Sequence, residues 1–413
     1  MSERIVSARL RAVAAMASLA IACGSSSGGA EPAPAPPAST TAPPASTSPP
    51  APSTNTIAPL EAADFPAPLS RAEIRPTNAN LAEDIFEKKW QASLGSVVTF
   101  MRSYPGAYWA DLARVDAKRI PGPEGLSLGD PHPDNFGFLR LNGPTKYVVN
   151  DLDDSGYGSV AVDAARYFTI LRLSPYASVL ADALKQYVEA AFDAARDVGV
   201  DPALVPDLDA VARKALDKAT SAGKLKLSAD VLAPTSEERQ ALSSLVASDA
   251  RLAQLALADA AVYVKADGGS GGLRRYWLLV DGTAGRTLLE LKEAVVPGAE
   301  LGRHTKTLGA DERLSVLTSA FWGVTPATDY FYVNVLGARF LVRDRLPRQT
   351  PDLSVMTDSA RAGVILAQAR LLAATHRPAW KSSPIDKSAL SAWLDGSSRT
   401  LAARWQAAFA AAR

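Results

Sequence analysis

Apolar positions along the chain follow two different periods after about residue 60. Within residues 80–103 they keep helical spacing, with Leu81 and Ile85 one turn apart, which predicts a helix. Thr235 and Glu238 have the spacing of a capping box and predict a helix start. The helical pattern also covers residues 177–199, 208–223, 309–322, 358–376 and 388–412.

Strand patterns occupy a shorter part of the chain. Residues 146–151, "KYVVND", are rich in β-branched residues, and residues 260–296 read as three strands separated by Gly-rich turns. Two more strands are expected within residues 329–346, joined at Leu336-Gly337. The layout predicts an α+β fold. Its parts are a helical part at residues 59–255, a small antiparallel sheet part at 256–346 and C-terminal helices at 347–413.

The N-terminus has the features of an export signal. A basic start is followed by the apolar stretch "AVAAMASLAIA" and then by Cys23, the only cysteine of the chain. "AIAC" before "GSSSGG" resembles the lipobox of bacterial lipoproteins, which implies lipidation of Cys23 after removal of residues 1–22. Residues 23–58 are Pro/Ala/Ser/Thr-rich and fit a disordered tether. The prediction is an exported, membrane-anchored lipoprotein; the alternative is an ordinary signal peptide that ends near an accidental cysteine.

The composition narrows the possible functions. The hydrophobic content of 47% allows a sizeable core, and a single cysteine excludes an intrachain disulfide. The net charge of +1 provides no basic excess to neutralise a phosphate backbone, so no nucleic-acid partner is expected.

The stretch "GDPHPDNFG" carries the first candidate chemistry. Asp130 and Asn135 are five residues apart, a spacing similar to that of protein kinases and aminoglycoside-type phosphotransferases. That resemblance implies that Asp130 orients and deprotonates an acceptor hydroxyl, that Asn135 binds Mg²⁺, and that His132 has a structural role. The alternative is a polar loop that caps neighbouring elements.

An acid-rich stretch, "VVNDLDDSGYG", follows the strand at residues 146–151. Asp151 and Asp153 are the predicted magnesium ligands, because Mg²⁺ prefers hard oxygen donors, and Asp154 is expected to start a turn. Asp163 has the spacing of a structural Asp that anchors the catalytic loop; a simple helix N-cap is the alternative.

A phosphate-covering loop and a lysine are expected in the sheet part. The stretch from Asp267 to Gly272 offers Gly268, Gly269, Ser270, Gly271 and Gly272 between two strands, although glycines also make ordinary hairpin turns. Lys292 stands on the next strand, as the nucleotide-binding lysine of kinases does, or is a surface lysine of an edge strand. A lysine in a run of leucines needs a partner if it is buried. Glu312 is the candidate, with Glu293 as the alternative.

The order of these features is the reverse of the order in kinases, which implies a circularly permuted, two-lobed kinase-like fold. The blocks "GD-x-H-x-x-NFG", "ND-x-D-D" and "KEA" resemble those of a bacterial family of unknown function, over roughly Met101 to Arg377. Arg274 and Arg275 are expected to be exposed hairpin charges, whereas Arg343 and Arg345 lie either near the nucleotide or simply at the surface.

The expected function is an ATP- and Mg²⁺-dependent phosphotransferase acting on a small-molecule or protein hydroxyl acceptor. Export conflicts with ATP, because little ATP exists outside the bacterial inner membrane. The alternatives are therefore another nucleotide or phosphoryl donor, or an envelope lipoprotein that uses a kinase-like scaffold for binding without catalysis. A metallophosphoesterase lacks enough histidines, with only three in the chain, and a serine hydrolase lacks its G-x-S-x-G motif.

Overall fold

The computed structural model combines α-helices with several antiparallel sheets, and it describes residues 57–141, 143–193, 199–266, 268–323 and 330–413. All of these belong to one unit, Ser53–Arg413. The α-helices of these residues are α1 (Arg71–Ile74), α2 (Glu83–Ser93), α3 (Val97–Ser103), α4 (Pro105–Leu112), α5 (Val160–Leu173), α6 (Leu180–Phe192), α7 (Leu208–Ala219), α8 (Ser236–Ser248), α9 (Ala310–Trp322), α10 (Asp358–Trp380) and α11 (Lys387–Ala412).

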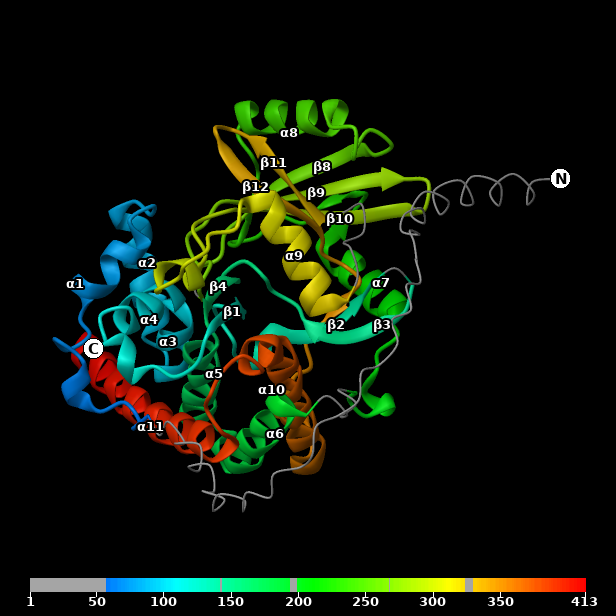
Figure 1. Cartoon of the computed structure of the whole chain (residues 1–413). Coiled ribbons are helices and arrows are strands. Elements are labelled where there is room, and N and C mark those ends of the chain that lie inside the picture. The colour runs from blue at the N-terminus through cyan, green and yellow to red at the C-terminus, as the bar shows by residue number, and fades with distance from the viewer. Residues whose placement is uncertain (1–56, 142, 194–198, 267, 324–329) are drawn as a thin grey trace, which may run out of the picture. The chain divides into compact units, whose positions relative to one another are not determined.

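One antiparallel sheet has the strand order β11-β12-β10-β9-β8-β7. Its strands are β7 (Val231–Leu232), β8 (Ala256–Tyr263), β9 (Arg275–Gly282), β10 (Gly285–Glu293), β11 (Tyr330–Val335) and β12 (Ala338–Asp344). Helix α8 packs Leu242, Leu245 and Val246 against one face of this sheet (Figure 1). Side chains alternate along each strand, so Leu289 and Leu291 face α8 whereas Glu290 and Lys292 face the opposite side.

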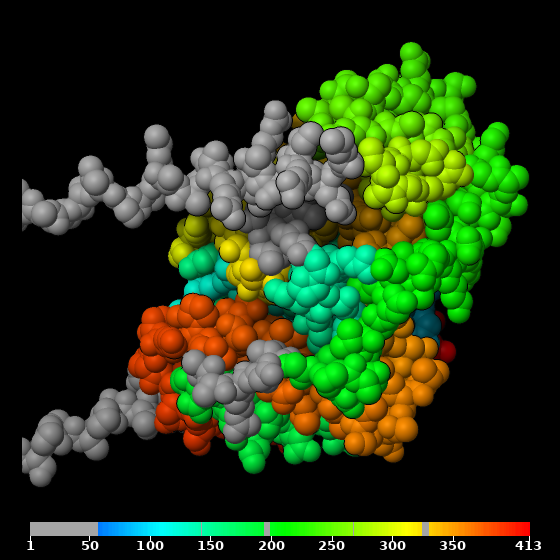
Figure 2. Space-filling view, turned by 90° about the vertical axis from the view of Figure 1, so that its right-hand side faces the viewer, coloured from blue at the N-terminus to red at the C-terminus, as the bar shows by residue number. Residues whose placement is uncertain are grey.

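Smaller sheets carry the loops that precede α5. Strands β13 (Arg348–Gln349), β2 (Phe136–Arg140) and β3 (Thr145–Val149) form one sheet, and β1 (Glu124–Ser127) pairs with β4 (Gly156–Ser159). A further pair joins β5 (Thr220–Ser221) to β6 (Lys224–Leu225). Figure 2 shows the blue-green β2–β3 region between the green segments of the larger sheet and the orange-red C-terminal helices.

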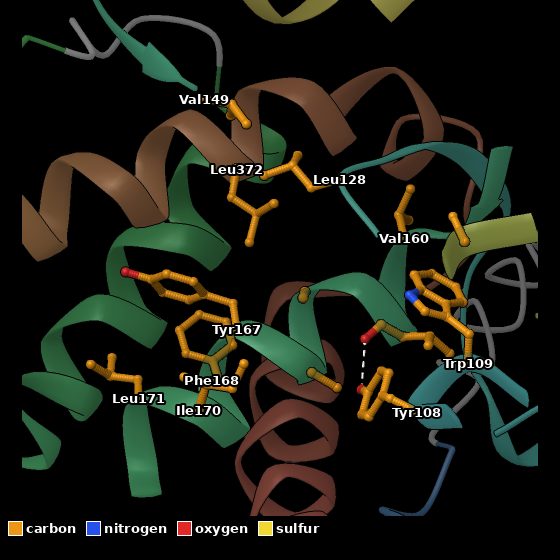
Figure 3. Close-up of a cluster of buried hydrophobic side chains, with 14 of the residues drawn as sticks. Tyr108, Trp109, Leu128, Val149, Val160, Tyr167, Phe168, Ile170, Leu171 and Leu372 are labelled. Carbon is orange, nitrogen blue, oxygen red and sulfur yellow. Dashed lines mark hydrogen bonds between the residues drawn. The ribbon is translucent and has the colours of Figure 1, made fainter. Parts of the chain in front are cut away.

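The main hydrophobic core joins residues of the helices and of the small sheets. Leu128, Val160, Tyr167 and Leu372 belong to it (Figure 3). The Tyr108 hydroxyl donates a hydrogen bond of 2.8 Å to the carbonyl of Val162, which fixes α4 against α5. Leu128, from the segment that follows β1, is therefore packed in the same core as α5 and α10.

Most element predictions are confirmed. The α+β class is observed, α8 begins at the predicted capping box of Thr235 and Glu238, and the β11–β12 hairpin turns at Leu336 and Gly337. Both turn residues have positive φ, 52° and 71°, as a type I′ hairpin turn requires. The single helix predicted over residues 80–103 is wrong: it is two helices, α2 and α3, separated near Gly95.

The N-terminal predictions fall on residues that the structure does not describe. Cys23, the signal segment 1–22 and the tether up to residue 56 lie outside the described part of the chain. Among the described helices, none combines the length and the apolar character that a bilayer crossing needs.

Candidate functional site

Segments far apart in sequence line one polar pocket, which we call the acid–lysine pocket. It lies between the loop after β1, the loop after β3, the loop between β8 and β9, and the end of β10. Its lining residues are Arg102, Asp130, His132, Asn135, Asp151, Asp153, Asp154, Lys265, Gly268, Gly269, Ser270 and Lys292.

The loop that carries Asp130 is anchored by Asp163. This fully buried carboxylate accepts hydrogen bonds from the backbone N–H groups of Leu128 and Gly129, at 2.7 and 2.8 Å. His376 Nε2 lies 3.0 Å from the same carboxylate. The N-cap of α5 is Ser159, so the N-cap alternative for Asp163 is wrong and the structure gives it the loop-anchoring position.

Gly129 is required where the two loops cross. Its φ is +77°, and a Cβ at this position would overlap the carbonyl oxygen of Asp154. The Gly129 carbonyl also accepts a 2.6 Å hydrogen bond from the Trp109 indole. The close approach brings the loop of Asp130 directly against the acid-rich loop.

Asp130 is held by a buried arginine. Arg166 on α5 donates to Asp130 Oδ1 from Nε at 2.9 Å and from Nη2 at 2.5 Å. Burial alone would raise the pKa of Asp130, but Arg166 and His132 outweigh it and hold the pKa below its ordinary value. Asp130 is therefore an ionised hydrogen-bond acceptor at neutral pH.

His132 supports the same carboxylate. Its Nδ1 accepts from the backbone N–H of Asp134 at 3.2 Å, and its Nε2 lies 3.5 Å from Asp130 Oδ2. Burial and the nearby Arg102 lower the pKa of His132. The neutral ring therefore carries its proton on Nε2, facing Asp130. The structural role of His132 stays a prediction.

Lys292 faces two of the predicted magnesium ligands. Its ammonium lies 3.3 Å from Asp151 Oδ2 and forms a second ion pair with Asp153. Lys292 is 2% exposed, and burial lowers its pKa to about 8 although Asp151 opposes the shift. Burial raises the pKa of Asp151, but Lys292 and Arg343 outweigh that effect, so this carboxyl is ionised.

The predicted Lys292–Glu312 pair is wrong. Glu312 lies at the surface, 3.5 Å from Lys306, and the partners of Lys292 come from the acid-rich loop instead. Successive helical residues point about 100° apart. In α9 it is therefore Arg313, not Glu312, that faces the site, where it donates to the Tyr332 hydroxyl at 2.7 Å. Glu293, the other candidate, pairs with Arg274 on the opposite face of the strand.

Three arginines surround a single glutamate on the Lys292 face of the sheet. Glu290 is fully buried and pairs with Arg275, Arg343 and Arg345 at 3.1, 2.6 and 3.1 Å. The expectation that Arg275 is exposed is wrong: it is buried and also donates to Ser270 at 2.5 Å. Arg343 is buried beside Asp151, at 3.7 Å. Sequence reasoning missed Glu290. It stands two positions before Lys292 in the same run of leucines, so the same argument, that a buried charge needs a partner, could have identified it.

The Gly-rich loop contributes three of its five predicted residues to the pocket. Gly268, Gly269 and Ser270 line it. The N–H of Gly271 is engaged by the carbonyl of Gly268 at 2.9 Å, and Gly272 lies so close to Ile85 and Leu81 of the helical part that a Cβ there would clash. Asp267 lies outside the described residues.

Asn135 and Asp154 complete the polar lining. Asn135 Nδ2 donates to the Asp130 carbonyl at 2.8 Å, which leaves its Oδ1 as an acceptor. Asp154 Oδ1 accepts from the Gly298 N–H at 3.0 Å. Burial, Asp130 and Asp151 raise the pKa of Asp154 to about 7, so it is partly protonated at neutral pH. Asp154, expected only to start a turn, also lines the pocket and binds the backbone of Gly298.

The donor chemistry suits a hard cation in part. Asn135, Asp151 and Asp153 offer the amide and carboxylate oxygens that Mg²⁺ prefers. Within the described residues, no group of three or more His, Cys, Asp or Glu has metal-binding geometry. A magnesium ion here would therefore take its remaining ligands from phosphate oxygens and water.

Comparison with known families gives one match. Residues 209–412, just under half of the chain, match the model described as "Uncharacterized protein conserved in bacteria (DUF2252)". This supports the predicted resemblance to a bacterial family of unknown function. The match includes Lys292 and the Gly-rich loop, whereas Asp130, Asn135 and Asp151 precede it. No curated protein matches the chain, and no solved structure does.

Proposed function

We propose that the protein transfers a phosphoryl group from ATP, or another nucleotide, with Mg²⁺ to a hydroxyl acceptor on a small molecule or protein. The observation that carries the proposal is the shared pocket of Asp130, Asn135, Asp151 and Lys292 beneath the Gly268–Ser270 loop. Carboxylate, amide oxygen and ammonium at close quarters are the groups with which phosphotransferases position and neutralise a phosphate chain.

Asp130 would orient the acceptor. Phosphoryl transfer passes through a loose transition state, so positioning and charge stabilisation contribute most of the rate. The lowered pKa of Asp130 makes it a weak base but a good hydrogen-bond acceptor. Arg166 donates twice to Oδ1 of this carboxylate, so the attacking hydroxyl would be held at Oδ2, which also faces His132 Nε2 at 3.5 Å.

Asn135, Asp151 and Asp153 would hold the magnesium ion. When bound, Mg²⁺ supplies positive charge against the phosphate oxygens. In the structure, Lys292 forms ion pairs with both Asp151 and Asp153. A magnesium–phosphate ligand would meet both halves of this ion pair: the carboxylates would face the metal and the ammonium would face the phosphates.

The ion pairs that surround Lys292 carry a small excess of positive charge. The connected ion pairs join four cations, Lys292, Arg275, Arg343 and Arg345, to three carboxylates, Asp151, Asp153 and Glu290. One positive charge is in excess. Arg345 is 34% exposed, so water solvates part of this excess. The pocket lining also holds four carboxylates, Asp130, Asp151, Asp153 and Asp154, so it suits a magnesium–phosphate ligand better than a bare anion.

The order of elements supports a permuted kinase-like arrangement. The Gly-rich loop joins β8 to β9, Lys292 stands on β10, and α9 with the β11–β12 hairpin follows. The loops of Asp130 and Asp151 come earlier in the chain. Chemistry depends on where groups lie in space and not on chain order, so permutation leaves the proposed roles unchanged.

Calorimetry and a transfer assay test the proposal on the full chain. We expect ATP to bind only with Mg²⁺, and we expect labelled γ-phosphate to pass to an acceptor in the wild type but not in Asp130→Asn. Binding without any transfer, unaffected by Asp130→Asn, would favour the alternative of a binding scaffold. If no nucleotide binds, with or without Mg²⁺, both hypotheses are refuted: nucleotide-dependent transfer and nucleotide binding without transfer.

Export and lipid anchoring through Cys23 form a separate part of the proposal, based on the lipobox-like "AIAC". Membrane fractionation of the wild type and Cys23→Ser tests it. We expect the wild type in the membrane fraction and the variant in the soluble fraction. If export holds, the transfer assay is repeated with inorganic polyphosphate, because ATP is scarce outside the inner membrane.

A further inference from the structure

A second buried lysine lies on the other side of the Gly-rich loop. Lys89 on α2 is 3% exposed, whereas its neighbour Lys88 is at the surface. Lys89 follows the buried Phe86 by three positions and so shares its face of the helix. Neither the predicted site nor the proposed function uses this residue.

The Lys89 ammonium reaches the loop directly. It donates to the carbonyl of Gly269 at 2.8 Å and to Asn78 Oδ1 at 3.0 Å, and it lies 5.5 Å from the ring centre of Tyr104. Both hydrogen-bond acceptors are neutral groups. A buried ammonium held by neutral acceptors is costly, and burial lowers the pKa of Lys89 to about 8. Simple core packing would be better served by a methionine.

The same loop has an anchor on its opposite side. Ser270 Oγ accepts a 2.5 Å hydrogen bond from Arg275 of β9. The rim of the acid–lysine pocket is thus fixed by two adjacent residues, one tied to the helical part and one to the sheet.

We propose that Lys89 is a positioning residue that holds the Gly268–Ser270 loop over the acid–lysine pocket. By fixing the Gly269 carbonyl, Lys89 sets the distance between the loop and Asp154, whose Oδ2 is 3.5 Å from where a Cβ of Gly269 would stand. The functional value of this contact rests on the proposed function, since a loop that covers phosphates must be held in place. The geometric part of the inference, that Lys89 holds the loop, does not depend on the proposed function.

Hydrogen–deuterium exchange of the full-length protein tests the geometric part. Lys89→Met removes the ammonium at nearly constant volume, and Lys88→Met is the matched control on the same helix. A hydrogen bond to a charged group is worth roughly 1.5–3 kcal/mol, so exchange of residues 264–274 should accelerate about 10- to 100-fold in Lys89→Met. The control should be unchanged, and Lys89→Gln, which keeps a donor, should recover part of the protection.

Two results would overturn the inference. One is unchanged exchange of residues 264–274 in Lys89→Met. The other is acceleration spread equally over α2, α3 and the loop, which a merely structural lysine would give. If Lys89→Met does not fold, Lys89→Gln is compared with Lys88→Met instead. Faster exchange confined to residues 264–274 supports the inference, and unchanged or evenly spread exchange contradicts it.

Kinetics separate this inference from the proposed function. Where the wild type transfers phosphate, Lys89→Met should raise KM for the nucleotide by about 10- to 100-fold and change kcat less, because the reacting groups stay in place. A fall in kcat with unchanged KM would contradict the positioning role. Where the wild type shows no transfer, the proposed function fails, but the exchange result still decides whether Lys89 holds the loop.

Discussion

Lys292→Met tests the central ion pair most directly, because it removes a buried charge from between two carboxylates. Breaking a fully buried ion pair from one side costs about 3–5 kcal/mol. Here the side chains of Asp151 and Asp153 are 30% and 19% exposed, so water can solvate them once Lys292 is gone. The substitution also relieves the burial penalty of the lysine itself. We therefore expect a smaller loss of unfolding free energy, about 1–2 kcal/mol.

The effect on ligand binding should be larger than the effect on stability. Losing a charge-assisted hydrogen bond to phosphate costs about 1.5–3 kcal/mol, so Mg²⁺-ATP should bind about 10- to 100-fold more weakly. Urea unfolding measures the first quantity and calorimetry the second. Lys146→Met, on strand β3 and away from the pocket lining, is the matched control and should change neither.

The pH dependence gives an independent check on the same variant. The pKa of Lys292 is lowered from 10.5 to about 8, so above that pH the folded protein binds fewer protons here than the unfolded chain. The contribution of Lys292 to stability should therefore rise as pH increases from about 8 to about 10. The wild type should gain stability relative to Lys292→Met over this range. A variant that binds nucleotide as tightly as the wild type would refute the role given to Lys292.

Three further substitutions test the rest of the site. Asp130→Asn should abolish transfer but preserve nucleotide binding, and urea unfolding should show a loss of about 3 kcal/mol because Arg166 loses its buried partner; retained turnover would contradict the role. The pKa of Asp154 is raised to about 7 by burial and neighbouring carboxylates, so the stability that this group contributes is fully present below about pH 4 and is lost as pH rises to about 7. Asp154→Asn should accordingly show flatter unfolding free energies between about pH 4 and about pH 7, and identical curves would disprove the shift. Asp163→Ala leaves two buried N–H groups of the loop that carries Asp130 without an acceptor, so thermal unfolding should report a loss of roughly 2–5 kcal/mol, more than for Asp163→Asn; equal losses would count against the anchoring role.

Local patterns were enough to predict most elements of the sheet part. The three strands around the Gly-rich turns, α9 and the β11–β12 hairpin follow from periodicity and turn residues, since these are short-range properties. The requirement that Lys292 has a partner also followed from the sequence. The identity of the partner did not, because Asp151 is 141 positions away and no local rule spans that distance.

Arg166 and Lys89, which sequence reasoning missed, are both charged residues on the buried face of a helix. Identifying them requires knowing which face of each helix is buried. Arg166 lies in the largely apolar helix α5, three positions after Asp163, and a buried arginine needs an anionic partner just as Lys292 does. Lys89 differs from Lys88 only by lying on the face of Phe86. Whether such a charge is buried depends on what packs against the helix, and that is a property of the tertiary structure.

The boundary of the family match at residue 209 does not coincide with a boundary of the site. Lys292, inside the match, is neutralised by Asp151, outside it, and His376, inside, lies 3.0 Å from Asp163, outside. A fragment of residues 209–412 alone would leave these buried groups without partners, at a cost of several kcal/mol for each broken pair. The charges of the pocket are therefore compensated only when both parts of the chain fold together. Any activity should accordingly be sought in a chain that contains both segments.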